Sequence, residues 1–298
     1  MTKNGIIVID KPSGITSHNV ISKLRWLLDE QKIGHCGTLD PIASGVLPVM
    51  VGNAVRASEY LVDHDKRYFA GIELGYETDT EDITGNILTR FDGKLPTFEE
   101  FAECVKSFEG RQYQTPPMYS ALKVGGVKLV NLARDGITVD RKEREIFISE
   151  IEPFETEDGY FIDVKCSRGT YIRTLCADIG RKLGCFGVMS SLIRTEVGQF
   201  KQADAVKYDD LCNMTREEIC SRLIPTDTLF KNLPEARADA FFTKLYINGE
   251  KIRLGKLRGI YGEVGDEFRF YVGDEFNSIG EIILGNDGKK YFTRKKKF

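Results

Sequence analysis

Short apolar runs of strand length recur through the first 170 residues, and they limit the fold more than any other feature of this sequence. They occupy residues 5–9 (GIIVI), 46–51, 67–75, 145–151 and 159–166. Apolar runs of this length, bounded by glycine, proline and polar residues, are typical of strands. The first two runs predict buried strands, and the last two can pair with each other.

Helical patterns are interspersed among these runs. Apolar residues recur at helical spacing within residues 17–31 and 171–183, and Gly184 follows the second segment as a natural C-cap. Residues 97–108 begin with T-F-E-E, a capping box in which the first and fourth residues satisfy each other's backbone amides. These segments therefore predict three helices.

Residues 111–136 form the longest segment without a periodic pattern. They hold a pair of prolines and a pair of glycines, Gly125 and Gly126. We predict a long irregular excursion here, of a kind that is often mobile or functional.

The sequence pattern changes near residue 230. Beyond it come short β-like runs separated by glycine, which predict a small all-β module over residues 231–298. This module holds 14 Lys and Arg against 10 Asp and Glu and ends in a basic run, whereas residues 1–230 carry a net charge of −7. A phosphate-bearing partner would meet local basic grooves, although a solvated tail explains the terminal basic run equally well.

Signals for membrane insertion and secretion are absent from the sequence. No apolar run approaches the roughly 18–20 residues of a membrane helix, and the N-terminal run is too short for a signal peptide. The seven cysteines are scattered, without a C-x-x-C pair, which is typical of reduced thiols. We therefore expect a cytoplasmic protein that makes no membrane contact.

One carboxylate, Asp40, stands in a glycine-rich turn (GHCGTLDPIASG) directly before the second apolar run. It is either an Asx-turn residue that fixes the loop or a rigidly held nucleophile or general base. A catalytic aspartate needs a cationic partner, and Arg173 is a candidate, although it could equally be a surface cation. Tyr68 could likewise pack in the core or stack on a flat substrate.

The sequence contains no pattern that is typical of a metal site or a nucleotide site. The histidines are His18, His35 and His64, and none has a second ligand at a metal-binding spacing. Neither a G-x-x-x-x-G-K-[ST] loop nor a G-x-G-x-x-G loop is present. We therefore expect no metal and no nucleotide cofactor.

Six sequence blocks, arriving in one order over about 200 residues, resemble the bacterial tRNA pseudouridine synthase B family. This family modifies the uridine at position 55 in the T-loop of tRNA. The blocks are GIIVIDKPSGITS, GHCGTLDPIASGVLPVMVGNA, DKRYFAGIELGYETDTEDITG, QTPPMYSALKVGGVKLVNLARDG, CSRGTYIRTLCADIG and SSLIRTEVGQF. Residues 231–298 are similar in position and type to the small β-rich RNA-binding (PUA) module of such enzymes.

The resemblance implies an α+β pseudouridine synthase fold, with a central mixed, largely antiparallel sheet flanked by helices. It implies a catalytic domain over residues 1–230 with a mobile thumb at about 111–136, followed by a PUA-like module over 231–298. The expected partner is tRNA, bound at the T-arm and elbow region. We expect no cofactor, no metal and no required protein partner, and a monomer.

The resemblance also implies roles for individual residues. Asp40 matches the reactive aspartate of the family's G-[TA]-L-D-P turn, and Arg173 matches its counter-ion in the G-T-Y-I-R block. Tyr68 matches the tyrosine that stacks on a flipped uracil and assists removal of the proton from C5. Tyr171 and Leu192 match positions that line the base pocket.

Further matches concern RNA contacts and support of the site. His35 matches the histidine that fills the space left by the flipped bases. Lys11, Pro12 and Arg56 match positions near the site or the RNA backbone. Asp82, in the T-D-T-E-D stretch, is expected to hold the arginine network in place.

Three alternative functions stay open at this point. A guide-RNA-dependent relative shares the aspartate turn and acts within a ribonucleoprotein. An RNA-binding helper of tRNA folding could retain the site incidentally. A metal-dependent hydrolase is the remaining enzymatic alternative, and activity that is insensitive to EDTA would exclude it.

Overall fold

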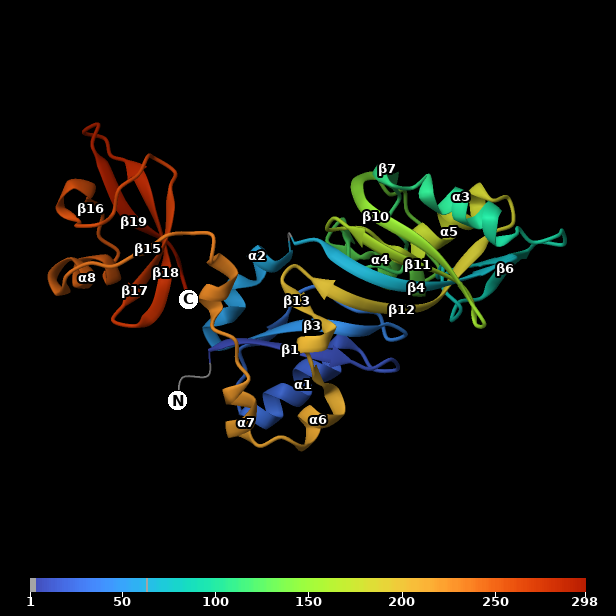
Figure 1. The fold of residues 1–298 in the computed structure, drawn as a ribbon, viewed down its shortest axis with the longest axis horizontal. Helices are drawn as coiled ribbons and strands as arrows, with labels where there is room; N and C mark the ends of the chain where they lie inside the picture. Colours follow the sequence, from blue (N-terminus) through green and yellow to red (C-terminus); the bar gives the residue numbers. More distant parts are fainter. Residues whose placement is uncertain (1–3, 63) are drawn as a thin grey trace.

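A computed structural model describes residues 4–62 and 64–298, and within them ten strands form one large sheet (Figure 1). The strand order is β14-β1-β3-β12-β4-β11-β10-β7, with β2 paired to β3 and β13 paired to β12. The strands are β1 (Gly5–Lys11), β2 (Ile33–His35), β3 (Ser44–Val51), β4 (Lys66–Leu74), β7 (Gly110–Gln114), β10 (Arg144–Thr156), β11 (Gly159–Cys166), β12 (Gly187–Val197), β13 (Phe200–Lys201) and β14 (Val206–Lys207).

The pairing within this sheet is mixed. Strand β12 runs parallel to β3, and β1 runs parallel to β14, while the remaining neighbours are antiparallel. The predicted pairing of residues 145–151 with 159–166 is confirmed, because β10 and β11 form an antiparallel pair. The predicted α+β class with a largely antiparallel central sheet is also confirmed.

The apolar run of strand β1 is explained by burial on both faces of the sheet. Ile7 and Ile9 face the main core on one side of the sheet, and Ile6 and Val8 face a second cluster on the other side. Successive side chains of a strand point to opposite faces, so a strand covered on both faces shows no polar alternation.

Helices cover the main core face at both ends of the sheet (Figure 1). They are α1 (Ser17–Leu28), α3 (Phe98–Lys106), α5 (Ile172–Lys182), α6 (Tyr208–Asn213) and α7 (Arg216–Ser221). The second cluster of β1 and β3 packs under η1 (Gly52–Ala57) and α2 (Ser58–Val62). In the described part of the chain, no helix is long and apolar enough to cross a membrane.

The three predicted helices are present, with one boundary corrected. The capping box at Thr97 forms as predicted, and Gly184 follows α5 with a φ of +74°. Helix α1 ends at Leu28 rather than near Gln31, because Asp29 adopts the left-handed conformation with a φ of +46°. That conformation stops helical hydrogen bonding and is seldom adopted outside glycine, asparagine and aspartate.

The predicted irregular excursion at 111–136 is more ordered than its sequence indicates. Its first residues complete the edge strand β7, which pairs with β10. It continues into a small hairpin of β8 (Lys123–Val124) and β9 (Val127–Lys128), followed by α4 (Leu129–Arg134). Gly125 and Gly126 form the hairpin turn with φ values of +58° and +85°, which glycine adopts without strain.

The C-terminal residues form a second sheet with its own core (Figure 1). Its order is β15 (Glu235–Ala236), β17 (Glu267–Val272), β18 (Glu275–Leu284), β19 (Lys290–Lys297) and β16 (Ile252–Arg253). The prediction of an all-β module is wrong in one respect, because helix α8 (Ala240–Ile247) packs Tyr246 against Phe270 and Phe292. Asp239 caps this helix by accepting from the Phe242 amide.

The two parts of the chain meet at α2 and η3 (Thr226–Phe230). Tyr60 of α2 packs edge-on against Phe230, and both rings lie near Phe298 at the chain end. Lys296 forms an ion pair with Glu59 of α2. The terminal basic run is therefore part of strand β19 and joins the two parts of the structure, rather than forming a solvated tail.

Candidate active site

The turn that holds Asp40 is clamped by the segment leading into α1. The Ser17 hydroxyl accepts from the Leu39 amide at 2.9 Å and lies 3.0 Å from the Leu39 carbonyl oxygen, to which it donates. The Gly14 amide donates to the Pro41 carbonyl at 2.8 Å. Because both neighbours of Asp40 are fixed by hydrogen bonds, its carboxylate is presented from a rigid backbone.

Asp40 is paired with an arginine from helix α5. Arg173 Nε lies 3.0 Å from Asp40 Oδ2, and the arginine side chain is 7% exposed while that of the aspartate is 39% exposed. The two terminal nitrogens of Arg173 donate to the carbonyl oxygens of Thr80 at 3.0 Å and Tyr119 at 2.8 Å. The structure thus brings together the aspartate and arginine that the sequence places 133 residues apart.

A cavity of about 600 Å³ opens beside this pair, within the range of small-ligand sites. Its walls come from the Asp40 turn, β4, β12, the start of α5 and the segment 119–130. They include Gly37, Thr38, Leu39, Asp40, Lys66, Tyr68, Tyr119, Ser120, Ala121, Lys128, Val130, Arg168, Gly169, Thr170, Tyr171, Ile172, Arg173, Leu192 and Arg194. Four of the predicted site residues beside Asp40 therefore line one cavity: Tyr68, Tyr171, Arg173 and Leu192.

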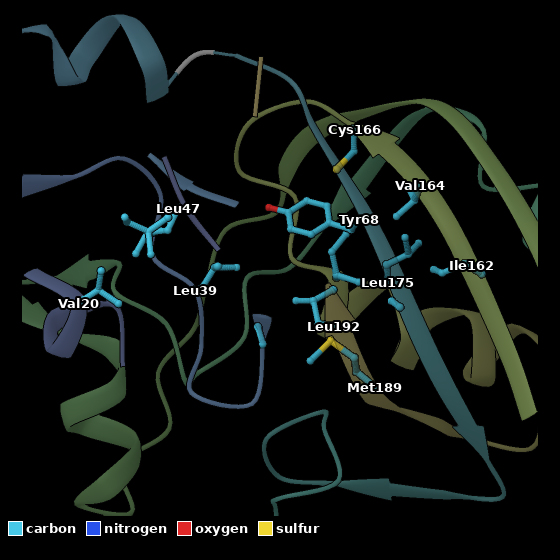
Figure 2. Close-up of a cluster of buried hydrophobic side chains, with 14 of the residues drawn as sticks. Val20, Leu39, Leu47, Tyr68, Ile162, Val164, Cys166, Leu175, Met189 and Leu192 are labelled. Atoms are coloured by element: carbon cyan, nitrogen blue, oxygen red, sulfur yellow. The ribbon is translucent and has the colours of Figure 1, made fainter. Parts of the chain in front are cut away.

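Tyr68 and Leu192 reach this cavity from neighbouring strands. Figure 2 shows the Tyr68 ring pointing away from β4, with its hydroxyl on the side of Leu39 and with Leu192 close by. Burial raises the pKa of the Tyr68 hydroxyl, while the charge and hydrogen bond of Arg194 oppose that rise. A buried aromatic face next to an aliphatic side chain suits a flat, apolar-faced group such as a nucleobase.

Tyr171, at the N-cap of α5, is held by a residue of the edge strand β7. The Gln114 side chain accepts from the Tyr171 amide at 2.8 Å and donates to the Tyr171 carbonyl at 3.0 Å. Gln114 is buried, so this pair of hydrogen bonds fixes the main chain where α5 enters the cavity wall. Burial raises the pKa of the Tyr171 hydroxyl, and the charges of Arg144 and Arg173 oppose the change.

Asp82 supports the arginine indirectly. Its buried carboxylate accepts from the Thr84 amide at 2.9 Å and from the hydroxyls of Thr80 and Thr84 at 2.7 and 2.6 Å. These bonds shape the loop between β5 (Tyr76–Thr78) and β6 (Ile87–Arg90). The Thr80 carbonyl of this loop then accepts from Arg173, so Asp82 acts on the arginine through the loop backbone.

Lys11 lies beneath the site and is fully buried. Its ammonium group donates to the carbonyl oxygens of Pro12 and Ile15, each at 2.8 Å. Burial lowers its pKa to about 8, although the charge of Asp40 opposes the change. This position favours support of the turn before α1 over contact with an RNA backbone.

Two predicted RNA contacts lie outside the cavity wall. His35 ends β2, where burial lowers its pKa and the charges of Arg194 and His18 act in the same direction. Arg56, in η1, is exposed and donates to the Lys297 carbonyl at 3.5 Å, beside the C-terminal sheet. Their roles in RNA binding stay predictions.

Two residues that line the cavity and one that supports it were missed in the sequence. Arg194 and Lys66 line the cavity, and Gln114 fixes Tyr171. Arg194 follows the predicted Leu192 by two positions in a strand, and this spacing places both on one face, so alternation could have identified it. Among the residues that the structure describes, no group of three or more His, Cys, Asp and Glu side chains is placed to hold a metal ion.

Known families and proteins match this chain over most of its length. The model of the TruB family pseudouridylate synthase N-terminal domain matches residues 25–172, and that of the tRNA pseudouridylate synthase B C-terminal domain matches residues 173–231. The tRNA pseudouridine synthase B of Alkaliphilus oremlandii is 42% identical over 290 residues, covering 97% of this chain and 96% of that protein. This chain belongs to the TruB family.

Other TruB relatives agree with this assignment. The tRNA pseudouridine synthase B of Francisella tularensis subsp. novicida is 39% identical over 299 residues and covers 98% of this chain and 95% of that protein. As a TruB protein the chain is an isomerase that converts uridine in tRNA into pseudouridine. The family predicted from six sequence blocks is therefore confirmed.

Solved structures share the fold of this TruB protein. A chain of the Cbf5-Nop10-Gar1 complex superposes with a TM-score of 0.70 at 27% identity, covering 98% of this chain and 84% of that one. A chain of an H/ACA RNP bound to a substrate RNA superposes with a TM-score of 0.69 at 25% identity, covering 99% and 85%. The predicted pseudouridine synthase fold is thereby confirmed.

Proposed function

We propose that this TruB protein acts on the uridine at position 55 in the T-loop of tRNA and that Asp40 is its reactive group. The observation that supports this proposal is the Asp40–Arg173 pair at the edge of a cavity lined by Tyr68 and Leu192. The cavity has the size of a small-ligand site, and it offers one partly exposed carboxylate, two buried arginines and an apolar wall. That set suits a flat, uncharged base attached to a sugar.

The base must leave its stack before the reaction, because a base stacked inside a folded loop cannot enter a protein cavity. The N1–C1′ bond of the uridine then breaks, the uracil rotates, and a C5–C1′ bond forms. The proton on C5 is lost and N1 gains a proton, so the product is an isomer of the substrate. Neither oxidation nor hydrolysis occurs in this sequence of steps.

Asp40 is placed either to attack the sugar or base or to remove a sugar proton. Arg173 keeps its carboxylate oriented through the Nε contact while leaving part of it open to the cavity. Tyr68 stacks on the flipped uracil and is the candidate base for the C5 proton. In water-excluding surroundings such preorganised groups have large effects on rate.

The T-arm and elbow of tRNA are proposed to bind across both parts of the chain. The protein is proposed to act as a monomer in the cytoplasm. Residues 1–230 would form the catalytic domain, with residues 111–136 as a thumb whose exposed Lys123 and Lys128 meet phosphates. Residues 231–298 would form the PUA-like module that binds the acceptor stem. Four exposed cations cluster on this module: Lys251, Arg253, Lys256 and Arg258.

The test is single-turnover release of tritium from C5-labelled uridine in a bare T-stem-loop RNA, in the presence of EDTA. We expect release by the wild type, none by Asp40→Asn, and normal release by Asp158→Asn, a matched control at an exposed position. An active Asp40→Asn protein would exclude the assigned role of this aspartate.

The same experiment separates the alternative functions. The structural neighbours include H/ACA complexes. A guide-dependent activity would give no tritium release on bare RNA. A role in tRNA folding would survive in Asp40→Asn, because RNA binding does not need the reactive carboxylate. The two roles can coexist in one protein.

A further inference from the structure

Arg194 is a fully buried cation whose contacts bracket the Asp40 turn. It lies on β12, with 1% of its surface exposed. Its Nε donates to the Val46 carbonyl at 2.7 Å, and its Nη2 donates to the Gly37 carbonyl at 2.9 Å. Gly37 lies three residues before Asp40 and Val46 lies six residues after it, so one guanidinium fixes both ends of the turn.

The main chain holds Arg194 in this position. Strand β12 runs against β3, and a Cβ atom added at Gly45 would lie 2.2 Å from the Arg194 carbonyl oxygen. Gly45 also has a φ of +100°, which favours glycine. This close approach fixes the main chain of Arg194 against β3, from which its side chain reaches the turn.

The same side chain reaches the second reacting group. Arg194 lies opposite Tyr68 in the β12–β4 pairing, and both side chains line the cavity. The charge of its guanidinium lowers the pKa of the Tyr68 hydroxyl, against the larger effect of burial. Arginine can serve several acceptors at once because its planar fork carries five N–H donors, which lysine lacks. The Asp40 turn and the Tyr68 side chain therefore share one buried cation as a neighbour.

We propose that Arg194 is a positioning residue that sets the distance and orientation between Asp40 and Tyr68 across the bound uracil. This inference rests on the proposed function. Arg173 holds the Asp40 carboxylate directly, whereas Arg194 holds the backbone that presents it. Displacement of a reacting group by about 1 Å is sufficient to slow an enzymatic reaction about 100-fold.

The test compares Arg194→Gln and Arg194→Lys with wild type, using the single-turnover rate at saturating T-stem-loop RNA and the Kd for the same RNA. We expect the maximal rate to fall about 100-fold in Arg194→Gln and at least about tenfold in Arg194→Lys. The Kd should stay within about threefold of wild type, since preorganisation is lost while the RNA-binding surface is kept. The matched control is Arg67→Lys, whose side chain pairs with Asp163 and Glu150 outside the cavity and whose rate should be unchanged.

A second measurement is a double-mutant cycle with Tyr68→Phe. Because Arg194 is proposed to position Tyr68, the fall in rate caused by Arg194→Lys should be smaller in a Tyr68→Phe background than in wild type. A wild-type rate in Arg194→Lys, a loss confined to the Kd, or additive effects in the cycle would overturn the proposal. Failure of Arg194→Lys to fold would also overturn it, because the residue would then serve the fold rather than the site.

The two proposals fail in different ways. A wild-type protein that leaves uridine 55 unmodified while forming pseudouridine at another position of full-length tRNA would refute the T-loop assignment alone. The Arg194 comparison is then made by measuring pseudouridine in the full-length transcript. An active wild type with an equally fast Arg194→Lys would refute the positioning role alone.

Discussion

Arg173 contacts Asp40 through Nε alone, at 3.0 Å, and uses its two terminal nitrogens on the carbonyl oxygens of Thr80 and Tyr119. The guanidinium is therefore anchored by two segments that lie outside helix α5. The aspartate approaches the one remaining nitrogen and keeps 39% of its side-chain surface exposed. The fixed partner of the pair is the cation, and the carboxylate remains accessible from the cavity.

Replacing Arg173 should remove this anchor. We expect Arg173→Lys to lower the maximal single-turnover rate by at least about 100-fold, because lysine cannot satisfy two carbonyls and Asp40 together. The matched control is Arg181→Lys on the exposed side of α5, which should stay within about twofold of wild type. Equal rates for both variants would contradict the assigned role of Arg173.

Asp82 should influence the rate from outside the cavity. Asp82→Ala leaves one amide and two hydroxyls of the loop without their shared acceptor, which costs about 1–3 kcal/mol of unfolding free energy. The rate should also fall, because the Thr80 carbonyl that accepts from Arg173 lies in this loop. Denaturant unfolding and tritium release measure the two effects. Asp92→Ala, at an exposed position, should change neither.

Gln114 should stabilise the entry of α5 into the cavity wall. Gln114→Leu removes both hydrogen bonds to the Tyr171 main chain. The Tyr171 carbonyl keeps the Leu175 amide as a donor, but the Tyr171 amide loses its acceptor, so we expect a loss of about 2 kcal/mol of unfolding free energy. The rate should fall as Tyr171 loses its fixed position. Urea denaturation is the direct measurement, and an unchanged unfolding midpoint would refute the expectation.

Lys11 should make stability depend on alkaline pH. Its pKa is about 8 in the folded protein and 10.5 for an exposed lysine, because burial disfavours the ammonium form. Between these values the unfolded chain binds more protons than the folded protein, so the Lys11 contribution to unfolding free energy rises with pH.

The measurement is the difference in unfolding free energy between wild type and Lys11→Met from pH 7.5 to 10.5. It should shift in favour of wild type by up to roughly 3 kcal/mol over this range. Lys94→Met, at an exposed position, serves as the control and should give a difference that is constant with pH. A constant difference for Lys11→Met as well would refute the expectation.

The exposed cations of residues 251–258 in the C-terminal module should contribute to RNA affinity through phosphates. Lys256→Ala and Arg258→Ala should each weaken tRNA binding and reduce the slope of log affinity against log salt by about one per lost phosphate contact. The rate at saturating RNA should be unchanged, because these residues lie outside the cavity. Filter binding at several salt concentrations decides the outcome, with Lys94→Ala as the control.

The sequence identified the local elements that carry their own signals. Four such elements formed as predicted: the strands at residues 5–9 and 46–51, the capping box at Thr97, and Gly184 at the C-terminal end of α5. The matched motif residues Asp40, Tyr68 and Arg173 also came together at one cavity. Local patterns were sufficient to predict the strands, the capping box and the C-cap, because each pattern depends on residues that are neighbours in the sequence.

Other features depended on contacts between distant segments. Helix α8 and strand β7 were missed, since one packs on the second sheet and the other extends an edge by pairing with β10. Gln114 was missed because its importance comes from burial, and nothing in the sequence around it indicates that its side chain is buried. Arg194 was missed although its spacing from Leu192 places both on one face of a strand.

By itself, the sequence determined the family, the strand and helix types and the reactive turn around Asp40, because these reside in short patterns of residues. Only the tertiary structure decided which polar groups are buried and what they contact. It placed Arg173 between two loops and Arg194 across both ends of the Asp40 turn. The physical reason is that a buried charge needs partners, and those partners come from strands that only folding brings together.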